Sequence, residues 1–223
     1  MPVYSITVRN TSGVTQNYYI TNDPPSLTGP ARSKPWSSVI SSAHCPNGAT
    51  AKFEIDTRKY YAYCTTSDGK PGDGVDVSVT QRRPVVLGRA NEDGSLTPGS
   101  SMKIVVQEGT PELVAGDQQS GPRGAFQFQT GNDFTLRDAK QEHFMIGYGN
   151  EAAPFALFMP QPNSTYTIQP RNIFYLSFGQ TTRGSIVDLT SLGEALKIDF
   201  ESLQNSQVTV VGDQTGQLVL QEE

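Results

Sequence analysis

Apolar and polar residues alternate with period two along much of the chain. Tyr4, Ile6 and Val8 are separated by polar residues, and the same is true of Phe53 and Ile55. Successive side chains of a strand point to opposite faces, so this pattern predicts strands with one face on a core. Such strands are typical of antiparallel sheets. The other alternating segments are residues 75–80, 126–128 and 196–201.

Three segments between His143 and Leu189 are apolar without alternation. They are residues 144–146, 155–159 and 173–176. An apolar run of this length is expected where a strand is covered on both faces. We therefore predict that the central strands lie here and that the N-terminal half forms a more exposed sheet.

Turn-forming residues separate these segments, most clearly at 22–25, 67–72, 91–94 and 116–124. Their regular spacing is typical of sandwiches and barrels. No segment keeps a 3.6-residue apolar period for three turns. The best helical candidate is residues 189–195, where we expect a single helical turn. The sequence thus predicts one all-β domain over residues 1–223, an antiparallel two-sheet sandwich or open barrel with minimal helix.

Composition agrees with many short strands and narrows the list of partners. Hydrophobic residues make up 35% and charged residues 17%, beside 21 Gly and 15 Pro. The net charge is −5 and the basic residues do not cluster beyond Arg82 and Arg83, which argues against nucleic acid. No apolar run approaches the roughly 20 residues that cross a bilayer, and no leader pattern opens the chain. We therefore expect a soluble cytoplasmic protein with no membrane partner, and export without a leader stays open.

Two stretches of the chain support a family resemblance. The first is the strand-like opening from Tyr4 to Gly13, which ends in Asn10-Thr11-Ser12-Gly13. The second is the aromatic stretch from Phe174 to Gly179, followed by Gly184-Ser185-Ile186-Val187-Asp188. Both resemble segments of the proteins similar to the rhizosphere-induced protein RhiA. The resemblance implies an all-β fold and carries no established chemistry.

Few residues are suited to catalysis. His143 enters the most apolar part of the chain, where it could act as a base facing a cavity, with Asp188 or Asp138 as partner. A histidine satisfied by backbone or solvent at a strand end is the ordinary explanation. His44 and Cys45 are adjacent, and on a strand they would point to opposite faces, which argues against a catalytic pair.

Aromatic residues give the stronger signal for binding. Tyr61 and Tyr63 project from one face of a predicted strand, while Ala62 and Cys64 take the other face. Tyr18 and the single tryptophan, Trp36, lie in the same half of the chain. Aromatic surfaces edged by polar residues suit sugars or planar small molecules, although tyrosines also pack on ordinary sheet faces.

Metal and cofactor chemistry has little support. Asp68, Asp73 and Asp76 lie in a glycine-rich loop that could wrap Ca²⁺, but an ordinary hairpin loop is the better explanation. Cys45 and Cys64 are expected to be free, partly buried thiols. We predict no metal and no cofactor.

Three functions remain open. The first is a non-catalytic, lectin-like module that binds a carbohydrate or small molecule through Tyr61, Tyr63, Trp36 and Tyr18. The second is a cofactor-independent isomerase, cyclase or hydrolase that uses His143 and Asp188 in a β-enclosed cavity. The third is a self-associating structural protein whose strand edges pair in a homo-oligomer.

Overall fold

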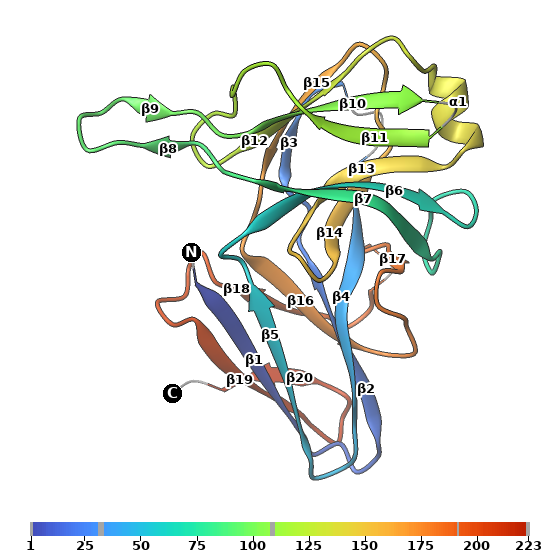
Figure 1. Cartoon of the computed structure of the whole chain (residues 1–223). Coiled ribbons are helices and arrows are strands. Elements are labelled where there is room, and N and C mark those ends of the chain that lie inside the picture. The colour runs from blue at the N-terminus through green and yellow to red at the C-terminus, as the bar shows by residue number, and fades with distance from the viewer. Residues whose placement is uncertain (1, 31–33, 108–109, 191, 222–223) are drawn as a thin grey trace.

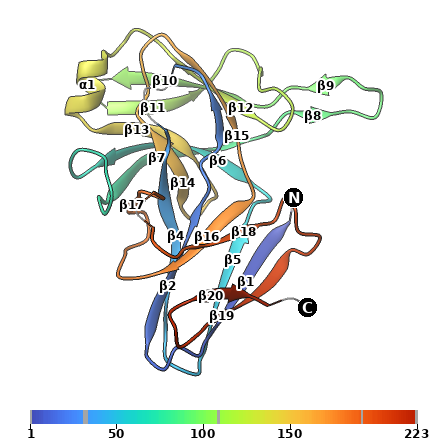
Figure 2. The same ribbon diagram turned by 180° about the vertical axis from the view of Figure 1, so that it is seen from behind.

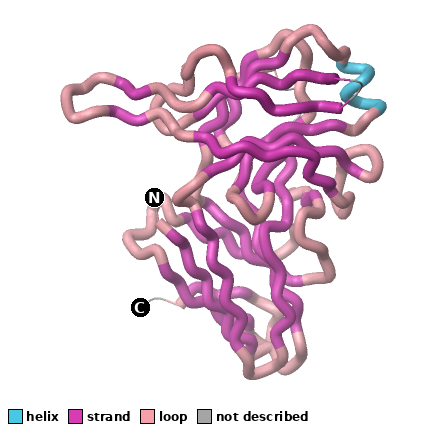
Figure 3. Tube along the Cα trace, viewed as in Figure 1, coloured by secondary structure: helices cyan, strands magenta, loops and turns pink. Residues whose placement is uncertain are grey.

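The computed structural model describes residues 2–30, 34–107, 110–190 and 192–221. Strands dominate this part of the chain (Figure 3). The all-β sandwich predicted from alternation is confirmed, although it contains more than two sheets.

The largest sheet has nine strands and forms the layer that the other sheets cover. Its strands follow the order β18-β16-β2-β4-β14-β13-β6-β7, and the short β17 also pairs with β4. All its pairings are antiparallel. Its strands are β2 (Gln16–Asn22), β4 (Trp36–Cys45), β6 (Tyr60–Ser67), β7 (Val77–Val85), β13 (Phe144–Gly149), β14 (Pro154–Phe158), β16 (Ile173–Phe178), β17 (Ile186–Val187) and β18 (Leu196–Asp199).

Two smaller sheets lie at opposite ends of the molecule (Figures 1 and 2). One has the order β20-β19-β1-β5 and the other has the order β11-β10-β12-β15-β3. A separate hairpin of β8 (Arg89–Ala90) and β9 (Leu96–Thr97) projects from the body. The remaining strands are β1 (Val3–Asn10), β3 (Ser26–Thr28), β5 (Thr50–Asp56), β10 (Ser101–Gln107), β11 (Thr110–Ala115), β12 (Phe126–Thr130), β15 (Thr165–Gln169), β19 (Gln207–Gly212) and β20 (Leu218–Leu220).

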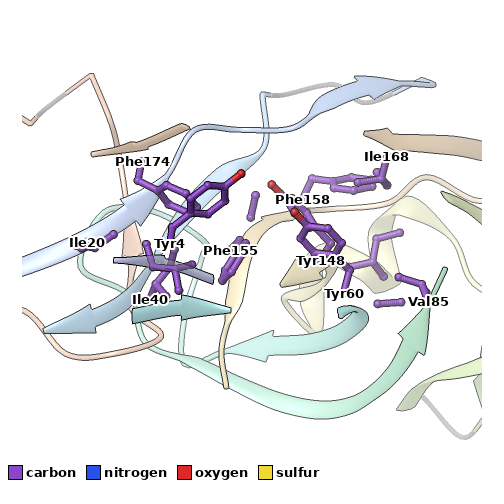
Figure 4. Close-up of a cluster of buried hydrophobic side chains, with 14 of the residues drawn as sticks. Tyr4, Ile20, Ile40, Tyr60, Val85, Tyr148, Phe155, Phe158, Ile168 and Phe174 are labelled. Atoms are coloured by element: carbon purple, nitrogen blue, oxygen red, sulfur yellow. The ribbon is translucent and has the colours of Figure 1, made fainter. Parts of the chain in front are cut away.

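One continuous apolar core joins the nine-stranded sheet to both smaller sheets. Near the four-stranded sheet, the rings of Tyr4 and Phe200 stack with centroids 4.3 Å apart. Near the five-stranded sheet, the centroids of Phe158 and Tyr166 are 4.9 Å apart. Figure 4 shows part of the aromatic cluster between these ends. Aromatic pairs at such distances add roughly 0.5–1.5 kcal/mol each beyond the area they bury.

The opposite face of the nine-stranded sheet is also covered in part. Residues 182–190, here called the strap, include β17, which pairs with β4, and two of their side chains pack on this face. Ile186 packs with Tyr63, Met145 and Leu157, while Val187 packs with Tyr19 and Val39. Every residue of β13 and β14 is buried, which confirms the prediction of central, covered strands for these two segments. The third segment differs, because β16 lies next to the edge strand β18 and its Tyr175 is half-buried.

The prediction of a more exposed N-terminal half is wrong for β2 and β6, which are buried almost throughout. It holds for β7, an edge strand that begins at Val77 and leaves Val79 exposed. The alternation in residues 75–80 therefore predicts more burial of these side chains than the structure shows. The reason is that few residues cover the faces of an edge strand.

The helix lies elsewhere than the sequence indicated. Helix α1 (Leu136–Gln141) begins with a capping box in which Thr135 and Asp138 bond each other's backbone amides. The described part of residues 189–195 forms turns. Among the described residues, no helix is long and apolar enough to cross a membrane.

A buried asparagine, Asn22, joins four segments at the end of β2. Its side-chain amide donates to the carbonyls of Arg171 and Ile173 at 2.9 and 2.8 Å, and its Oδ1 accepts from the Tyr148 hydroxyl. Its backbone carbonyl accepts from Ser37 Oγ at 2.7 Å. Burial is the main reason that the pKa of Tyr148 is raised well above its ordinary value, so the phenol stays a donor.

We predict that Tyr148→Phe lowers the free energy of unfolding by about 1–2 kcal/mol, and Asn22→Ala by about 2–4 kcal/mol, because each leaves buried partners unsatisfied. Urea unfolding followed by far-UV circular dichroism measures both changes. The half-buried Tyr175 is the control: Tyr175→Phe should change stability by no more than about 0.5 kcal/mol. Equal effects of Tyr148→Phe and Tyr175→Phe would contradict the role given to Asn22.

Candidate functional site

A surface cleft of about 900 Å³ opens where the end of β2, the start of β4, β16 and the strap meet. Two of the residues singled out in the sequence, Trp36 and Asp188, line it. The other lining residues are Asp23, Pro24, Pro25, Leu27, Gly29, Lys34, Pro35, Ser37, Tyr175, Val187, Leu189 and Thr190.

Asp23 is held in the cleft wall by charge and by hydrogen bonds. Its Oδ2 lies 2.8 Å from Nη1 of Arg171, and its Oδ1 accepts from the Tyr175 hydroxyl at 3.2 Å. Its backbone amide donates to the Ile173 carbonyl at 2.8 Å. Burial raises the pKa of Tyr175, and the charge of Asp23 raises it further. Tyr175 therefore stays protonated, with its ring on the cleft.

Asp188 also lines the cleft, and it belongs to the strap. Its Oδ1 accepts from the hydroxyl and the amide of Thr190 at 2.6 and 2.9 Å, which lowers the pKa of this carboxyl. Its own amide donates to Oδ1 of Asp73 at 2.9 Å. Asp188 is therefore an ionised, locally oriented acceptor at neutral pH.

Trp36 supplies the largest aromatic surface of the cleft. It is the first residue of β4, it is half-buried, and it lies opposite Leu157 of β14 in the sheet register. Its ring packs against the Tyr63, Met145 and Leu157 cluster. A cleft lined by a large apolar ring and by oriented carboxylates can bind a molecule that has an apolar face and hydroxyl groups at its edge.

Tyr61 and Tyr63 share the face that the sequence assigned to them. Both pack in the cluster that contains Trp36, while Ala62 and Cys64 face the main core. Tyr63 lies opposite Gly147 and is 1% exposed, and its hydroxyl donates to the Asn150 carbonyl. Tyr61 is half-buried.

Tyr18 lies on the opposite face of the nine-stranded sheet. It is buried in the main core, close to Gly212, where an added Cβ would meet the Tyr18 hydroxyl at 2.5 Å. The four aromatic residues singled out in the sequence therefore do not form one surface, and only Trp36 lines the cleft.

His143 lies just past helix α1, in the turn before β13. Its φ of 48° is left-handed, which is common for the residue that ends a helix, and its carbonyl accepts from the Ser67 amide at 3.2 Å. It does not line the cleft that contains Asp188. Asp138, the other acid considered, caps α1. His44 bonds the side chain of Asn17 through Nδ1 at 2.9 Å.

The acidic loop before β7 holds the strap. Oδ1 of Asp76 accepts from the hydroxyls of Thr182 and Ser185, and Asp73 accepts from Asp188 as described. These bonds give Asp73 and Asp76 a structural role. The part of the chain that the structure describes holds no group of three or more His, Cys, Asp or Glu residues placed to bind a metal ion.

Sequence reasoning missed Asp23, Lys34 and Tyr175. Asp23 belongs to a segment read only as a turn, Asn22-Asp23-Pro24-Pro25, and Tyr175 belongs to the aromatic stretch of the family resemblance. One signal in the sequence could have pointed to Asp23, namely the change from a buried strand to a rigid proline turn. Binding residues concentrate in loops that a rigid scaffold positions.

Comparison with protein families extends the resemblance to the whole chain. The RhiA family model matches residues 1–223. The chain belongs to the RhiA family. The stretches that resemble this family provide Tyr175, Val187 and Asp188 to the cleft. No curated protein and no solved structure matches the chain.

The two thiols are predicted to be unreactive in the folded protein. Both cysteines are free and buried, and burial raises the pKa of Cys45 and raises that of Cys64 to about 12. Thiolate, the reactive form, is therefore scarce at pH 8. A chromogenic disulfide reagent should find no fast-reacting thiol in native protein and two in urea. A single fast-reacting thiol in native protein would contradict the burial of that cysteine.

Proposed function

We propose that this RhiA-family protein is a cytoplasmic, non-catalytic binding module for a carbohydrate or similar small molecule, which lies in the cleft against Trp36. The observation that carries the proposal is the placement of half-buried Trp36 and Tyr175 beside two oriented carboxylates, Asp23 and Asp188.

The chemistry of the lining supports this ligand class. A sugar ring has an apolar face that an indole or phenol ring covers, and hydroxyl groups that donate to carboxylates. Asp23 and Asp188 already have fixed orientations, so little order is lost when a ligand binds. Pro24, Pro25 and Pro35 stiffen the wall, and a volume of about 900 Å³ is ordinary for a small-molecule site.

The arrangement favours binding over catalysis. General acid–base chemistry requires a proton donor or acceptor within hydrogen-bond reach of the reacting group. The cleft brings Asp188 together with Asp23 and Lys34, while His143 lies outside its lining. Asp23 forms an ion pair with Arg171, and Asp188 accepts a hydrogen bond from Thr190. An ionised carboxylate accepts hydrogen bonds, so both side chains are suited to that role.

Ligand binding can be followed through the single tryptophan of the chain, which lies in the cleft. We expect titration with a panel of mono- and oligosaccharides to give a saturable change in Trp36 emission for at least one member. Tyr175→Ala should weaken that ligand roughly tenfold, because it removes an aromatic contact. Isothermal calorimetry gives the same affinities independently of fluorescence.

The matched control is Phe178→Ala, which removes another half-buried aromatic ring from β16, outside the cleft. It should leave the affinity within about twofold. Saturable sugar binding that Trp36→Ala and Tyr175→Ala both leave unchanged by calorimetry would place the ligand elsewhere. No binding by any sugar in the panel, or by a glycan array, would contradict the carbohydrate class.

The cofactor-independent enzyme is the alternative, and its separate test uses His143 and Asp188. If these residues act together, His143→Ala and Asp188→Ala should each abolish any turnover detected in a substrate screen. We expect instead that Asp188→Ala alone weakens ligand binding, and that His143→Ala leaves binding within about twofold because it lies outside the cleft lining. Equal loss of a measured turnover in both variants would favour the enzyme.

A further inference from the structure

Strand β5 is an open edge of the four-stranded sheet, in which it pairs with β1 (Figure 1). Within the described ranges, no strand pairs with its other side. β4 leads into β5 through a short turn but does not pair with it. The Asp56 end of β5 borders a surface cavity of about 390 Å³. One long side of β5 is therefore open to another strand.

The hydrogen bonds to β1 show which backbone groups of β5 point to the open side. The Asn10 amide donates to the Ala49 carbonyl at 3.0 Å, and the Thr57 amide donates to the Pro2 carbonyl at 3.4 Å. Bonding to one neighbour recurs at every second residue of an antiparallel strand, so the odd-numbered residues between them bond β1 as well. The amides and carbonyls of the even-numbered residues of β5 therefore point to the open side.

The other edges of the large described sheets are protected against pairing with another chain. β3, β18 and β20 have only three or four residues each. β7 contains Pro84 and a register shift, while β11 contains Pro111 and donates from its Leu113 amide to Gln81 of β7. Short strands, prolines, bulges and covering segments are the usual protections of an edge. β5 has seven residues, no proline and an unbroken register with β1, so it is a long, regular edge.

The charged residues of β5 are complementary to those of a second copy of the same strand. Lys52 and Glu54 are 58% and 63% exposed, and the buried Phe53 lies between them on the core face. Two antiparallel copies of β5 that meet at Phe53 place Lys52 of each copy opposite Glu54 of the other copy. The same register brings the outward amides and carbonyls of both copies together. A register centred on Lys52 or on Glu54 would place like charges opposite each other, which is destabilising.

We propose that two copies of this protein form a homodimer through β5, whose antiparallel pairing about Phe53 joins the two four-stranded sheets into one continuous sheet. Each copy contributes the same strand, so the interface is closed and pairs both open edges. The exposed ion pair between Lys52 and Glu54 within each chain contributes little to stability, so it exchanges readily for pairs between the chains. No residue of β5 lines the Trp36 cleft, and the dimer does not depend on the function proposed for that cleft.

Sedimentation velocity of the full chain in a low-salt buffer tests the dimer. We expect a concentration-dependent equilibrium of monomer and dimer, which about 0.5 M salt should weaken because the ion pairs are exposed. Lys52→Glu and Glu54→Lys should each weaken the dimer roughly tenfold, because each places like charges opposite each other at two positions. An equimolar mixture of the two variants should form a heterodimer about as stable as the wild-type dimer, since every Glu then lies opposite a Lys.

Lys103→Glu is the matched control, because it makes the same charge change on an exposed lysine of β10, which has a strand on each side. It should leave the dissociation constant of the dimer within about twofold. Circular dichroism checks that each variant is folded. A wild-type chain that stays monomeric at every concentration would overturn the dimer. Equal weakening by Lys103→Glu and Lys52→Glu, or a mixture of the two β5 variants that stays monomeric, would overturn the pairing about Phe53.

Discussion

The hydrogen bonds of Asn22 are the interaction on which the cleft depends. This side chain is fully buried and connects β2, β13 and the segment before β16, while its backbone carbonyl binds Ser37 at the start of β4. A buried amide left without partners costs about twice what a satisfied hydrogen bond contributes, so these segments are held in one arrangement. The next residue is Asp23, so the same bonds that satisfy the core orient a carboxylate of the cleft.

The second constraint is that the nine-stranded sheet must be covered on both faces. The smaller sheets cover one face, and the strap covers part of the other with Ile186 and Val187. A covering segment nine residues long cannot hide the whole face. The Trp36 cleft opens at the end of the strap where Asp188 lies. The cleft is therefore a consequence of an incomplete cover.

The sequence predicts the fold better than the site. Alternation identifies β1 and β5, and unbroken apolar runs identify β13 and β14, because burial acts directly on side-chain polarity. The helix was missed although Thr135 and Asp138 form a capping signal, since a six-residue helix shows no full period. Tyr18 and Tyr63 show the limit for the site: both are tyrosines on strands, and only tertiary packing decides that they are buried on opposite faces. Asp23 and Tyr175 are 152 residues apart, a contact that no local pattern reports.

The strap is held in a way that favours a preformed site over one that closes on its ligand. Asp76 binds the hydroxyls of Thr182 and Ser185, Asp73 binds the Asp188 amide, and Ile186 and Val187 are buried between these points. Moving the strap would break these bonds and expose both apolar side chains, so a weak ligand could not drive the change. A preformed site loses little conformational entropy on binding, and its selectivity comes from shape and from the direction of its acceptors. The aromatic residues and carboxylates of the cleft are therefore already in the geometry that the proposed ligand would meet.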